Sequence, residues 1–470
     1  MTPPPSRSPR VSSHAVAAAL DALRPQFGDR LTENPTIRTQ HANTLSRVPS
    51  EPPDAVIFPL TTDEVAAIVR TCAAHSVPMI PFGTGTSFEG HVNAPRGGLS
   101  IDTLRMKRIV AVNADDLDCV VEAGVTRMEL NDHVRQQGLF FPIDPGADAS
   151  LGGMAATRAS GTNAVRYGTM RDNVLALTVV LPNGEIVRTA GRARKSSAGY
   201  DLTRLLIGAE GTLGILTEVT LRLHGLPEQI SAGHCPFPDI RAACDTVIRT
   251  IQCGVSIARI ELLDEVQIKA CNAYSRLDLP ETPTLFVEFH GGPAAVAEQV
   301  ERFGDIAREF SSGAFVWADR PEDRTRLWTA RHNSYWAACG LRPGAKGIPT
   351  DVCVPISQLA DCIGETKVDI VATGLVAPII GHVGDGNFHV LPLVDDSDKA
   401  ELERAFGFVD RMVARAIAME GTCTGEHGIG QSNRKYMALE FGDAGLALMR
   451  TIKRAIDPLN VMNPGKILFD

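Results

Sequence analysis

The chain has 470 residues, more than one ordinary hydrophobic core accommodates, so its length predicts two domains. Apolar residues make up 44% and charged residues 21%, a balance that is typical of folded globular proteins and excludes a disordered chain. The formal net charge of −9 argues against nucleic-acid binding, which needs a clustered positive surface. A small anionic substrate is compatible with this charge, because a few local cations are enough to bind it.

No apolar run reaches the length of a membrane-spanning helix, so we expect no transmembrane segment. The ten cysteines are scattered without a Cys-x-x-Cys pair, which argues against iron–sulfur clusters and structural zinc. The first twenty residues hold three consecutive prolines and two arginines but no acid. Mitochondrial presequences share this composition, but the prolines would interrupt their amphipathic helix, so we expect a disordered tail.

The first predicted elements are a short helix at 14–24 and, from residue 51, alternating strands and helices. The pattern predicts a strand at 55–59, then a helix at 62–72 with an N-cap and an acidic first turn. A further strand is expected at 77–81. We therefore predict an N-terminal tail and helical segment at 1–50, followed by a first domain over 51–226.

A glycine-rich loop, Gly83-Thr-Gly-Thr-Ser87, follows the strand at 77–81 directly. It lacks the Gly-Lys-Ser/Thr of a P-loop, and it lacks the third glycine and following helix of a Rossmann fingerprint. Such loops are often plain turns, but this one could form a nest of backbone N–H donors for a pyrophosphate. Small residues gather again between Pro145 and Gly168 and from Gly208 to Gly214, flanking a strand predicted at 173–181. This density would let a flat cofactor lie against the backbone.

Near Pro227 the pattern changes to short strands alternating with amphipathic helices. The strands are predicted at 257–262, 284–289 and 314–318, and the helices at 240–251 and 294–310. This arrangement predicts an antiparallel sheet backed by helices, in a second domain over 227–425. The final segment, 426–470, is expected to return to the first domain.

Two histidines frame a turn in Gly381-His-Val-Gly-Asp-Gly-Asn-Phe-His389. The residues Gly384–Asn387 favour a tight turn and exclude a helix, so we predict strand, turn and strand with a histidine at each base. A histidine is usually a surface or satisfied core residue, but a second glycine-rich segment contains Glu426 beside His427.

His382, His389 and Glu426 together would complete the protein ligands of a divalent metal with open positions for substrate. His427, if it is not a ligand, could act as a base. No His-Glu-x-x-His motif occurs, so a zincin-type protease is not supported.

Several of these stretches resemble a known flavoprotein family. Motifs similar to the flavin fingerprint of the vanillyl-alcohol oxidase/p-cresol methylhydroxylase superfamily are Pro81–Ser87, Gly152-Gly153, Glu210-Gly-Thr-Leu-Gly214 and Asn463-Pro-Gly-Lys466. The two histidine segments resemble the FAD-dependent D-2-hydroxy-acid dehydrogenase branch of this superfamily. Its cytochrome-type D-lactate dehydrogenases are the most similar group, through Arg331-His-Asn333, Lys346-Gly347, Thr350-Asp-Val-Cys-Val-Pro355 and Gly421–Gly430. The likeness covers about residues 50–470.

The resemblance implies an α+β, two-domain flavoprotein with a p-cresol methylhydroxylase-type FAD-binding domain and an antiparallel-sheet substrate (cap) domain. The FAD pyrophosphate would bind Gly83, Thr84, Gly85, Thr86 and Ser87. The rest of the cofactor would contact Pro81, Pro145, Gly152, Gly153, Gly161, Tyr167, Ile215 and Asn463. Relatives that attach flavin covalently use His, Tyr or Cys, and the loop at 81–87 offers none, so non-covalent FAD is expected.

The reaction implied by the resemblance is the oxidation of a D-2-hydroxy acid, D-lactate to pyruvate, by hydride transfer from Cα to flavin. His427 would be the base, and the metal held by His382, His389 and Glu426 would be zinc or manganese. Arg331 would bind the substrate carboxylate, with Lys346 in the same role, although by sequence alone Arg331 could equally be a surface helix residue.

Two departures from relatives that oxidise 2-hydroxyglutarate bear on the substrate. Those relatives carry Asn where this chain has Leu391, and Thr where it has Tyr335. An apolar pocket at these positions favours lactate or a longer aliphatic hydroxy acid over a dicarboxylate. D-2-hydroxyglutarate and glycolate are the alternative substrates within the family.

The implied partners are a small 2-hydroxy acid and an electron acceptor such as cytochrome c or a quinone; an electron-transfer flavoprotein or oxygen stays open, and a homodimer is expected. The expected location is cytoplasmic or peripheral to an inner membrane, mitochondrial in a eukaryote. Two rival functions are a metal-dependent hydrolase that uses the same metal residues with a bound water, and a non-enzymatic flavin-binding protein. The hydrolase would have no need for the glycine-rich stretches, and the binding protein would have no need for His427.

Overall fold

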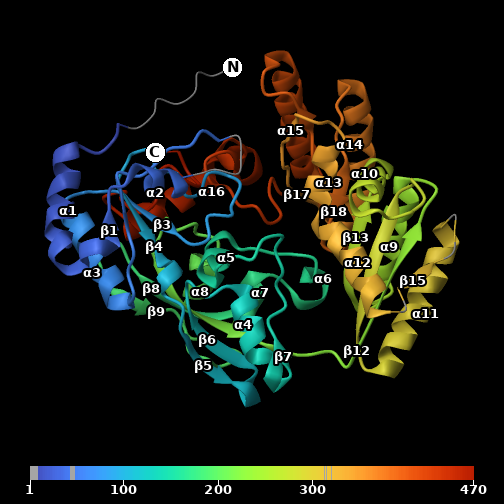
Figure 1. Cartoon of the computed structure of the whole chain (residues 1–470), viewed down its shortest axis with the longest axis horizontal. Helices are drawn as coiled ribbons and strands as arrows, with labels where there is room; N and C mark the ends of the chain where they lie inside the picture. Colours follow the sequence, from blue (N-terminus) through green and yellow to red (C-terminus); the bar gives the residue numbers. More distant parts are fainter. Residues whose placement is uncertain (1–8, 43–47, 312, 314, 319, 470) are drawn as a thin grey trace. The chain divides into compact units, whose positions relative to one another are not determined.

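The computed structural model describes residues 9–42, 48–311, 313, 315–318 and 320–469, and the chain forms two compact units (Figure 1). The first unit comprises Met1–Ala159, Thr169–Leu226 and Glu426–Asp470, and the second comprises Ser160–Gly168 and Pro227–Gly425. Residues 160–168, expected in the first domain, therefore group with the second unit. The start of the predicted disordered tail, residues 1–8, lies outside the described residues.

One sheet of the first unit has four strands in the order β1-β2-β4-β3. Its strands are β1 (Leu31–Thr32), β2 (Ala55–Ile57), β4 (Leu99–Asp102) and β3 (Met79–Phe82). The pairs β2–β4 and β4–β3 are parallel, and β1–β2 is antiparallel. Its core includes side chains of α1 (Ser13–Phe27) and α3 (Thr62–Ala74). Thr61 caps α3 by accepting from the Glu64 N–H, so this predicted helix and its flanking strands are confirmed.

The second sheet of the first unit is antiparallel and has the order β5-β6-β10-β8-β9. Its strands are β5 (Ile109–Asn113), β6 (Asp118–Glu122), β10 (Ile215–Arg222), β8 (Val174–Val180) and β9 (Ile186–Arg188). A short ribbon pairs β7 (Leu139–Phe140) with β11 (His224–Gly225). The other helices of the first unit are α2 (Pro35–Gln40), α4 (Arg127–Val134), α5 (Leu151–Thr157), α7 (Met170–Asn173), α8 (Leu202–Leu206) and α16 (Met437–Ile456).

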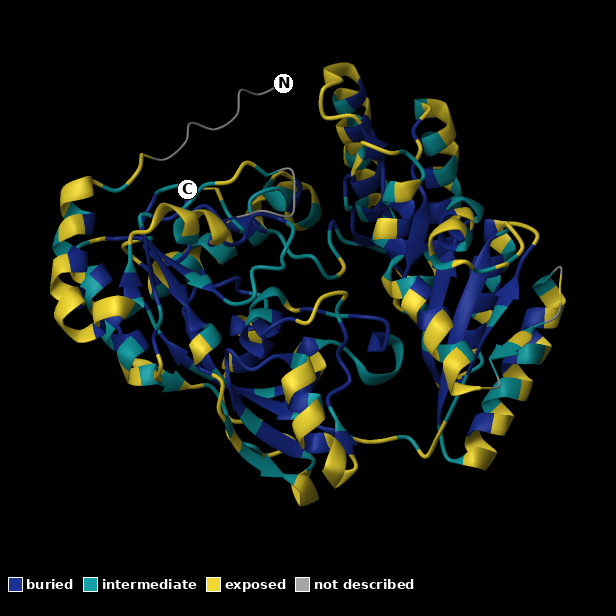
Figure 2. Cartoon of the chain, in the orientation of Figure 1, coloured by how far each residue is buried: buried dark blue, intermediate teal, exposed yellow. Residues whose placement is uncertain are grey.

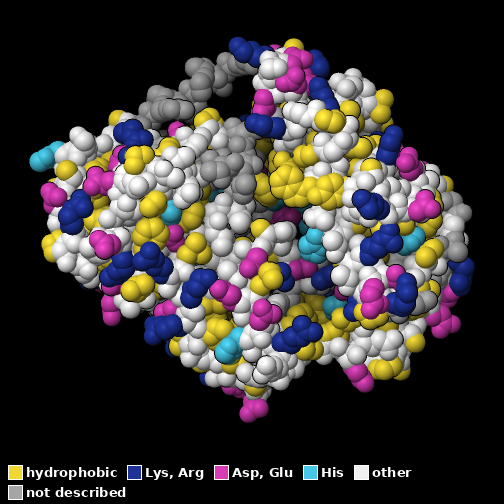
Figure 3. Space-filling view, viewed as in Figure 1, with side chains coloured by type: hydrophobic (Ala, Val, Ile, Leu, Met, Phe, Trp, Pro, Cys, Tyr) yellow, Lys and Arg dark blue, Asp and Glu magenta, His cyan; other side chains and the backbone are white. Residues whose placement is uncertain are grey.

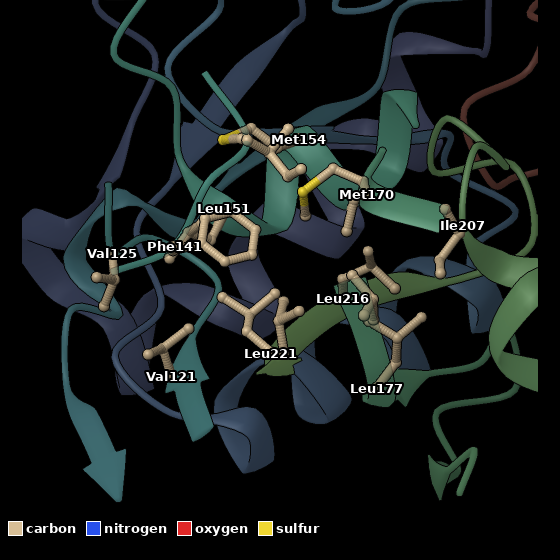
Figure 4. Packing of buried hydrophobic residues seen from close by; sticks show 14 of the residues in the cluster. Val121, Val125, Phe141, Leu151, Met154, Met170, Leu177, Ile207, Leu216 and Leu221 are labelled. Atoms are coloured by element: carbon tan, nitrogen blue, oxygen red, sulfur yellow. The ribbon is translucent and has the colours of Figure 1, made fainter. Parts of the chain in front are cut away.

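Helix α5 is fixed to this sheet by apolar side chains (Figure 4). Leu151 and Met154 of α5 belong to the same buried cluster as Leu216 and Leu221 of β10 and Leu177 of β8. All five side chains are nearly or fully buried. Burial of this kind contributes about 1.5–3 kcal/mol per large aliphatic side chain. The packing therefore holds the Gly152-Gly153 pair of α5 at a defined place over the sheet.

The second unit is built on a seven-stranded sheet in the order β15-β12-β14-β13-β18-β19-β17, with antiparallel pairing throughout. Its strands are β15 (Val316–Ala318), β12 (Gln229–Pro236), β14 (Thr284–Gly291), β13 (Ile257–Leu263), β18 (Ile379–Gly381), β19 (Asn387–Val390) and β17 (Val352–Cys353). The predicted antiparallel sheet is confirmed. Residue 314 of the predicted strand at 314–318 lies outside the described residues.

Helices pack against this sheet through apolar side chains. Leu263 and Phe286 cluster with Leu327 and Trp328 of α12, and the Phe289 ring lies 5.8 Å from a phenylalanine ring of α11. The helices of the unit are α6 (Ala164–Tyr167), α9 (Ile240–Gln252), α10 (Glu265–Ser275), α11 (Pro293–Phe310), α12 (Pro321–His332), α13 (Ser334–Gly340), α14 (Leu359–Thr373) and α15 (Lys399–Ala418). A further ribbon pairs β16 (Lys346–Gly347) with β20 (Leu393–Val394).

Within each unit the strands are mostly buried, whereas exposed residues gather on the outer faces of the helices (Figure 2). On the face drawn in Figure 3, basic and acidic side chains are interspersed. None of the helices among the described residues combines the length and the apolar character needed to cross a membrane.

Candidate active site

The two candidate histidine ligands lie at the base of a β-hairpin in the second unit. His382 directly follows β18, and His389 lies in β19, where it pairs with Ile380. A single turn at Val383–Asp385 joins the strands, and Gly386 adopts a positive φ of 79° that favours glycine. The predicted strand, turn and strand are confirmed. The two imidazole centroids lie 5.4 Å apart.

Each of the two rings is oriented by a hydrogen bond at Nδ1. The His382 Nδ1 lies 2.7 Å from Oε1 of Glu261, and the His389 Nδ1 lies 2.9 Å from the carbonyl oxygen of Thr350. Both partners are acceptors, so each Nδ1 carries the proton and each Nε2 becomes the candidate ligand atom. Such outer hydrogen bonds commonly fix the tautomer and orientation of metal-binding histidines.

Glu426 completes a group of three candidate ligands. It is bonded to Gly425, the last residue of the second unit, and its ligand atom and those of His382 and His389 all lie within 4.8 Å of one another. Two imidazole nitrogens and one carboxylate oxygen suit zinc or manganese. The donor set therefore fits a divalent metal.

The chain just before Glu426 is held by a buried carboxylate, Asp351. Its Oδ1 accepts from the Asn387 side-chain amide at 2.7 Å, and its Oδ2 accepts from the Thr424 hydroxyl at 2.7 Å. The backbones of Thr422 and Cys353 also form a bridge. These bonds tie the segment that ends at Gly425 to β17 and to β19, the strand that carries His389.

Glu261 is a residue that the sequence interpretation missed. It lies in β13 with a fully buried side chain, and it accepts from both His382 and Arg331. Arg331 lies in the last turn of α12, donates from Nε to Oε2 at 2.8 Å, and has Nη2 2.6 Å from the same oxygen in an ion pair. Burial opposes ionisation of Glu261, but the charge of Arg331 and the hydrogen bonds from Arg331 and His382 hold its pKa below the usual value. A carboxylate among Ile260, Leu262 and Leu263 was the sequence signal for such a role.

Lys346 differs from Arg331 in its surroundings. Its side chain is 72% exposed, and its ammonium group lies 2.8 Å from Oδ2 of Asp396. The assignment of Lys346 to carboxylate binding therefore rests on the sequence alone. The two residues expected to shape the substrate pocket, Leu391 and Tyr335, do meet, in one apolar cluster with Ala338 and Leu393.

His427 lies in the first unit beside Phe88 and Glu89. Its ring centroid is 5.1 Å from that of Phe88, and its Nδ1 is 3.8 Å from Oε1 of Glu89. The loop after it is anchored by Glu210, whose two oxygens accept from the N–H groups of Ile429 at 2.7 Å and Gly430 at 2.8 Å. Glu210 is a second buried carboxylate that the sequence interpretation had not assigned to this role.

The pKa of Glu210 reflects two opposed effects. Burial raises it, but nearby His91, with its Nε2 3.3 Å from Oε1, and the two backbone donors bring it below the usual value. Gly430 lies at the crowded end of this loop: it has a φ of 49°, and a Cβ there would lie 2.1 Å from the carbonyl oxygen of Glu89. The loop that carries His427 is thus fixed by its backbone.

The expected pyrophosphate loop approaches α5 in the first unit. A Cβ on Gly83 would lie 2.3 Å from Oγ of Ser150, and a Cβ on Gly153 would lie 2.9 Å from the same oxygen. The Ser150 N–H lies 3.4 Å from the Thr84 hydroxyl, and its own hydroxyl is buried without a hydrogen-bond partner among the described residues. A cradle of small residues around a buried polar atom fits a polar cofactor group. Gly85, Thr86 and Ser87 continue the same loop, partly exposed.

The other expected FAD residues have varied surroundings. Ile215 is only 1% exposed and belongs to the core that also contains side chains of β3, the strand of Pro81. The side-chain amide of Asn463 donates to the backbone carbonyl oxygens of His91 and Glu210, at 3.1 and 2.7 Å, and so joins the C-terminal segment to two earlier segments of the first unit. Pro145 and Gly152 lie in the first unit, whereas Gly161 and Tyr167 belong to the second, where the Tyr167 hydroxyl lies 2.8 Å from Nδ1 of His290.

Two family models match the chain, one described as an FAD binding domain at residues 53–190 and one as the C-terminal domain of FAD linked oxidases at residues 226–467. The chain is 49% identical over 467 residues to the probable mitochondrial D-lactate dehydrogenase of Danio rerio, covering 98% of this chain and 94% of that one. The chain belongs to the FAD-linked oxidases.

Two further comparisons refine this membership. The D-lactate dehydrogenase (cytochrome), mitochondrial, of Arabidopsis thaliana is 47% identical over 416 residues, covering 88% of this FAD-linked oxidase and 73% of the relative. The crystal structure of p-cresol methylhydroxylase with substrate bound matches with a TM-score of 0.80 at 19% identity, over 97% of each chain. The predicted superfamily, its branch of cytochrome-type D-lactate dehydrogenases and the α+β two-domain flavoprotein fold are therefore confirmed.

Proposed function

We propose that this FAD-linked oxidase uses a divalent metal to oxidise a D-2-hydroxy acid, with D-lactate converted to pyruvate. The observation that carries the metal-dependent part is the grouping of His382, His389 and Glu426, whose ligand atoms lie within 4.8 Å of one another. The substrate is supported by the relatives from Danio rerio and Arabidopsis thaliana, which are named as D-lactate dehydrogenases.

FAD, the divalent metal and the protein side chains would each supply a different part of the reaction. Bound FAD supplies the acceptor for the hydride that leaves Cα, and a bound divalent ion supplies Lewis-acid polarisation of the substrate hydroxyl. The loop Gly83–Ser87 together with Ser150 and Gly153 is assigned to the pyrophosphate, without a covalent bond to the flavin. His382 and His389 would present Nε2 to the metal because each Nδ1 donates elsewhere.

His427 is assigned as the base that removes the hydroxyl proton. Its Nδ1 faces Glu89 at 3.8 Å, so Nε2 is the nitrogen that would accept the proton. Glu426 and His427 are adjacent in sequence, so a metal ligand and a proton acceptor are supplied by one short segment. The backbone bonds from Ile429 and Gly430 to Glu210 keep this segment in place.

Arg331 is assigned to the substrate carboxylate. Its Nε donates to Glu261 and its Nη2 is ion-paired with the same carboxylate, so the remaining edge of the guanidinium, between Nη1 and Nη2, is the one we assign to the substrate. The apolar cluster that contains Leu391 and Tyr335 supports a small monocarboxylate side chain. A dicarboxylate would need a polar partner for its distal carboxylate at this place.

The acceptor and the location are proposed from the relatives. A cytochrome acceptor follows from the name of the Arabidopsis thaliana relative, with a quinone as the alternative. Both relatives are named as mitochondrial, and we propose the same location for a eukaryotic source of this chain. The homodimer stays a prediction.

The test is anaerobic mixing of the purified, FAD-loaded protein with D- and L-lactate, glycolate and D-2-hydroxyglutarate. We expect flavin absorbance to bleach fastest with D-lactate, and only slowly with the L-isomer. A colourless protein that hydrolyses esters or amides with the metal would favour the hydrolase. A yellow protein whose flavin no hydroxy acid bleaches would favour a flavin-binding protein without this activity.

A further inference from the structure

We propose that Glu261 is a positioning residue that joins the metal site to the substrate-carboxylate site, by holding His382 and Arg331 with its two oxygens. This inference rests on the proposed function, because it takes His382 as a metal ligand and Arg331 as the carboxylate-binding residue. Glu261 itself touches neither the metal nor the substrate in this account. Its role is to fix the two side chains that do.

Each carboxylate oxygen of Glu261 contacts a different partner. Oε1 accepts from Nδ1 of His382 at 2.7 Å, and Oε2 accepts from Nε of Arg331 at 2.8 Å and lies 2.6 Å from its Nη2 in an ion pair. The Glu261 side chain has no exposed surface, so water cannot replace either partner. A buried carboxylate needs such charged or N–H donors, because an unpaired charge in the interior is strongly destabilising. The carboxylate and its two partners therefore form one rigid unit.

The sheet places Glu261 opposite its histidine partner. In the antiparallel pairing of β13 with β18, Leu262 pairs with Gly381 and Leu263 pairs with Ile380. Carried one residue further, this register sets Glu261 opposite His382. Arg331 reaches the same carboxylate from α12, a helix whose Trp328 packs against the sheet beside Leu263. Three elements far apart in the sequence thus meet at one side chain.

A shared carboxylate makes the two sites interdependent. When His382 holds a cation through Nε2, its Nδ1–H becomes a stronger donor to Oε1, which fixes the carboxylate more tightly. The same carboxylate then holds Arg331 in the orientation that presents the Nη1–Nη2 edge. Because one carboxylate holds both side chains, a change at Arg331 is expected to alter metal affinity through Glu261.

The first test titrates Zn²⁺ into EDTA-treated, FAD-loaded full-length protein by calorimetry. Gln in place of Glu261 cannot accept from both partners, because one end of its amide is a donor. We expect Glu261→Gln to raise the zinc Kd about 10–100-fold. With zinc restored to saturation, KM for D-lactate should still be raised, because Arg331 has lost its anchor.

Glu288→Gln is the matched control. Glu288 lies on the neighbouring strand β14, is nearly as buried, and likewise has one histidine and one arginine partner, His290 at 2.8 Å and Arg259 at 3.6 Å. Neither partner is a candidate metal ligand. Its zinc Kd should stay within about twofold of the unsubstituted value, since it lacks the bond to a ligand. An equal rise in both variants would show a general effect of buried charge and overturn the proposal.

A second variant covers the case in which Glu261→Gln does not fold. Arg331→Lys keeps the positive charge but cannot make the two-nitrogen contact with Oε2. We expect it to raise the zinc Kd severalfold in the unsubstituted background. Where Glu261→Gln does fold, the effect of Arg331→Lys should vanish in its presence, as for two residues that act through one contact. Zinc affinity unchanged by Arg331→Lys would overturn the proposal.

The outcomes separate the inference from the function on which it rests. If the unsubstituted protein binds no zinc or manganese, the proposed metal site fails, and the inference fails with it. If it binds zinc and both Glu261→Gln and Arg331→Lys bind zinc equally well, the inference alone fails and the metal-dependent oxidation stands.

Discussion

Two buried carboxylates, Glu210 in the first unit and Glu261 in the second, carry out comparable tasks by different means. Glu210 binds mainly backbone, the N–H groups of Ile429 and Gly430, whereas the partners of Glu261 within the described part of the chain are side chains. A bond to backbone fixes the path of a loop whatever side chains it carries. A bond to a side chain fixes the direction of one functional atom, and so affects its chemistry directly.

A third buried carboxylate, Asp264, shows what the partners contribute. It caps α10 by accepting from the Gln267 N–H at 2.8 Å, and it has no ion pair among the described residues. Burial raises the pKa of Asp264 to about 7, whereas Glu210 and Glu261 both keep a pKa below the usual value. The contrast indicates that nearby histidine and arginine charges, and not only N–H donors, keep a buried carboxylate ionised.

The largest effect is expected at the residue that the Glu210-anchored loop presents. His427→Gln should lower kcat about 10²–10⁴-fold, because a positioned base is lost while the loop backbone stays in place. Steady-state turnover of D-lactate, with flavin and zinc content measured in parallel, tests this. His133→Gln, at an exposed position on α4, is the control. A kcat within a few-fold of the unsubstituted value would remove His427 from the mechanism.

Glu210, which holds the loop after His427, should contribute to the free energy of unfolding. Glu210→Gln places an amide N–H₂ against at least one backbone donor, so we expect the free energy of unfolding to fall by about 3 kcal/mol. Urea-induced unfolding followed by circular dichroism measures this loss, with exposed Glu185→Gln as the control. Since the pKa of Glu210 is lowered, its contribution should be present above pH ~4.5 and disappear in acid. An unchanged urea midpoint would contradict the anchoring role.

Asp264 sharpens the comparison because its pKa is shifted the other way. A carboxyl with a folded-state pKa of about 7 and an ordinary value of 3.8 contributes stability in acid that is lost as the pH rises to about 7. Asp264→Asn keeps the N-cap and removes the charge, so it should stabilise the protein by about 2 kcal/mol near pH ~8. The gain should disappear below pH ~4. Unfolding in urea at both pH values tests this, and an equal effect at the two would contradict the shifted pKa.

The smallest expected effect concerns substrate choice, which neither carboxylate sets. Leu391→Asn should raise kcat/KM for D-2-hydroxyglutarate relative to D-lactate about tenfold, by offering a polar partner in the apolar cluster. Leu391→Met, which conserves the volume, is the control and should leave the ratio nearly unchanged. An unchanged ratio in Leu391→Asn would separate this position from substrate recognition.

Local chemistry made much of the fold and part of the site predictable. The turn residues Gly384–Asn387 defined the hairpin between His382 and His389 without any long-range information, and the strand and helix patterns on either side of Pro227 indicated the sheets. The resemblance to flavoproteins added the FAD residues, because its motifs are short and contiguous.

What the sequence could not provide were pairings between distant elements. The contact of Glu261 with His382 depends on the register of β13 against β18, which are more than a hundred residues apart. Likewise, nothing in the composition of 160–168 indicates that α6 packs with β13 in the second unit rather than with the residues on either side. A single charge in an aliphatic strand marks a partner, but it does not identify that partner.

The most direct test of metal-assisted hydroxy-acid oxidation is anaerobic flavin bleaching by D-lactate in one preparation at three stages. The protein is measured as purified, after EDTA treatment with FAD retained, and after zinc or manganese is returned. We expect fast bleaching, loss of bleaching and recovery, in that order. Bleaching at an unchanged rate after the metal has been removed would contradict a role for the metal in the oxidation.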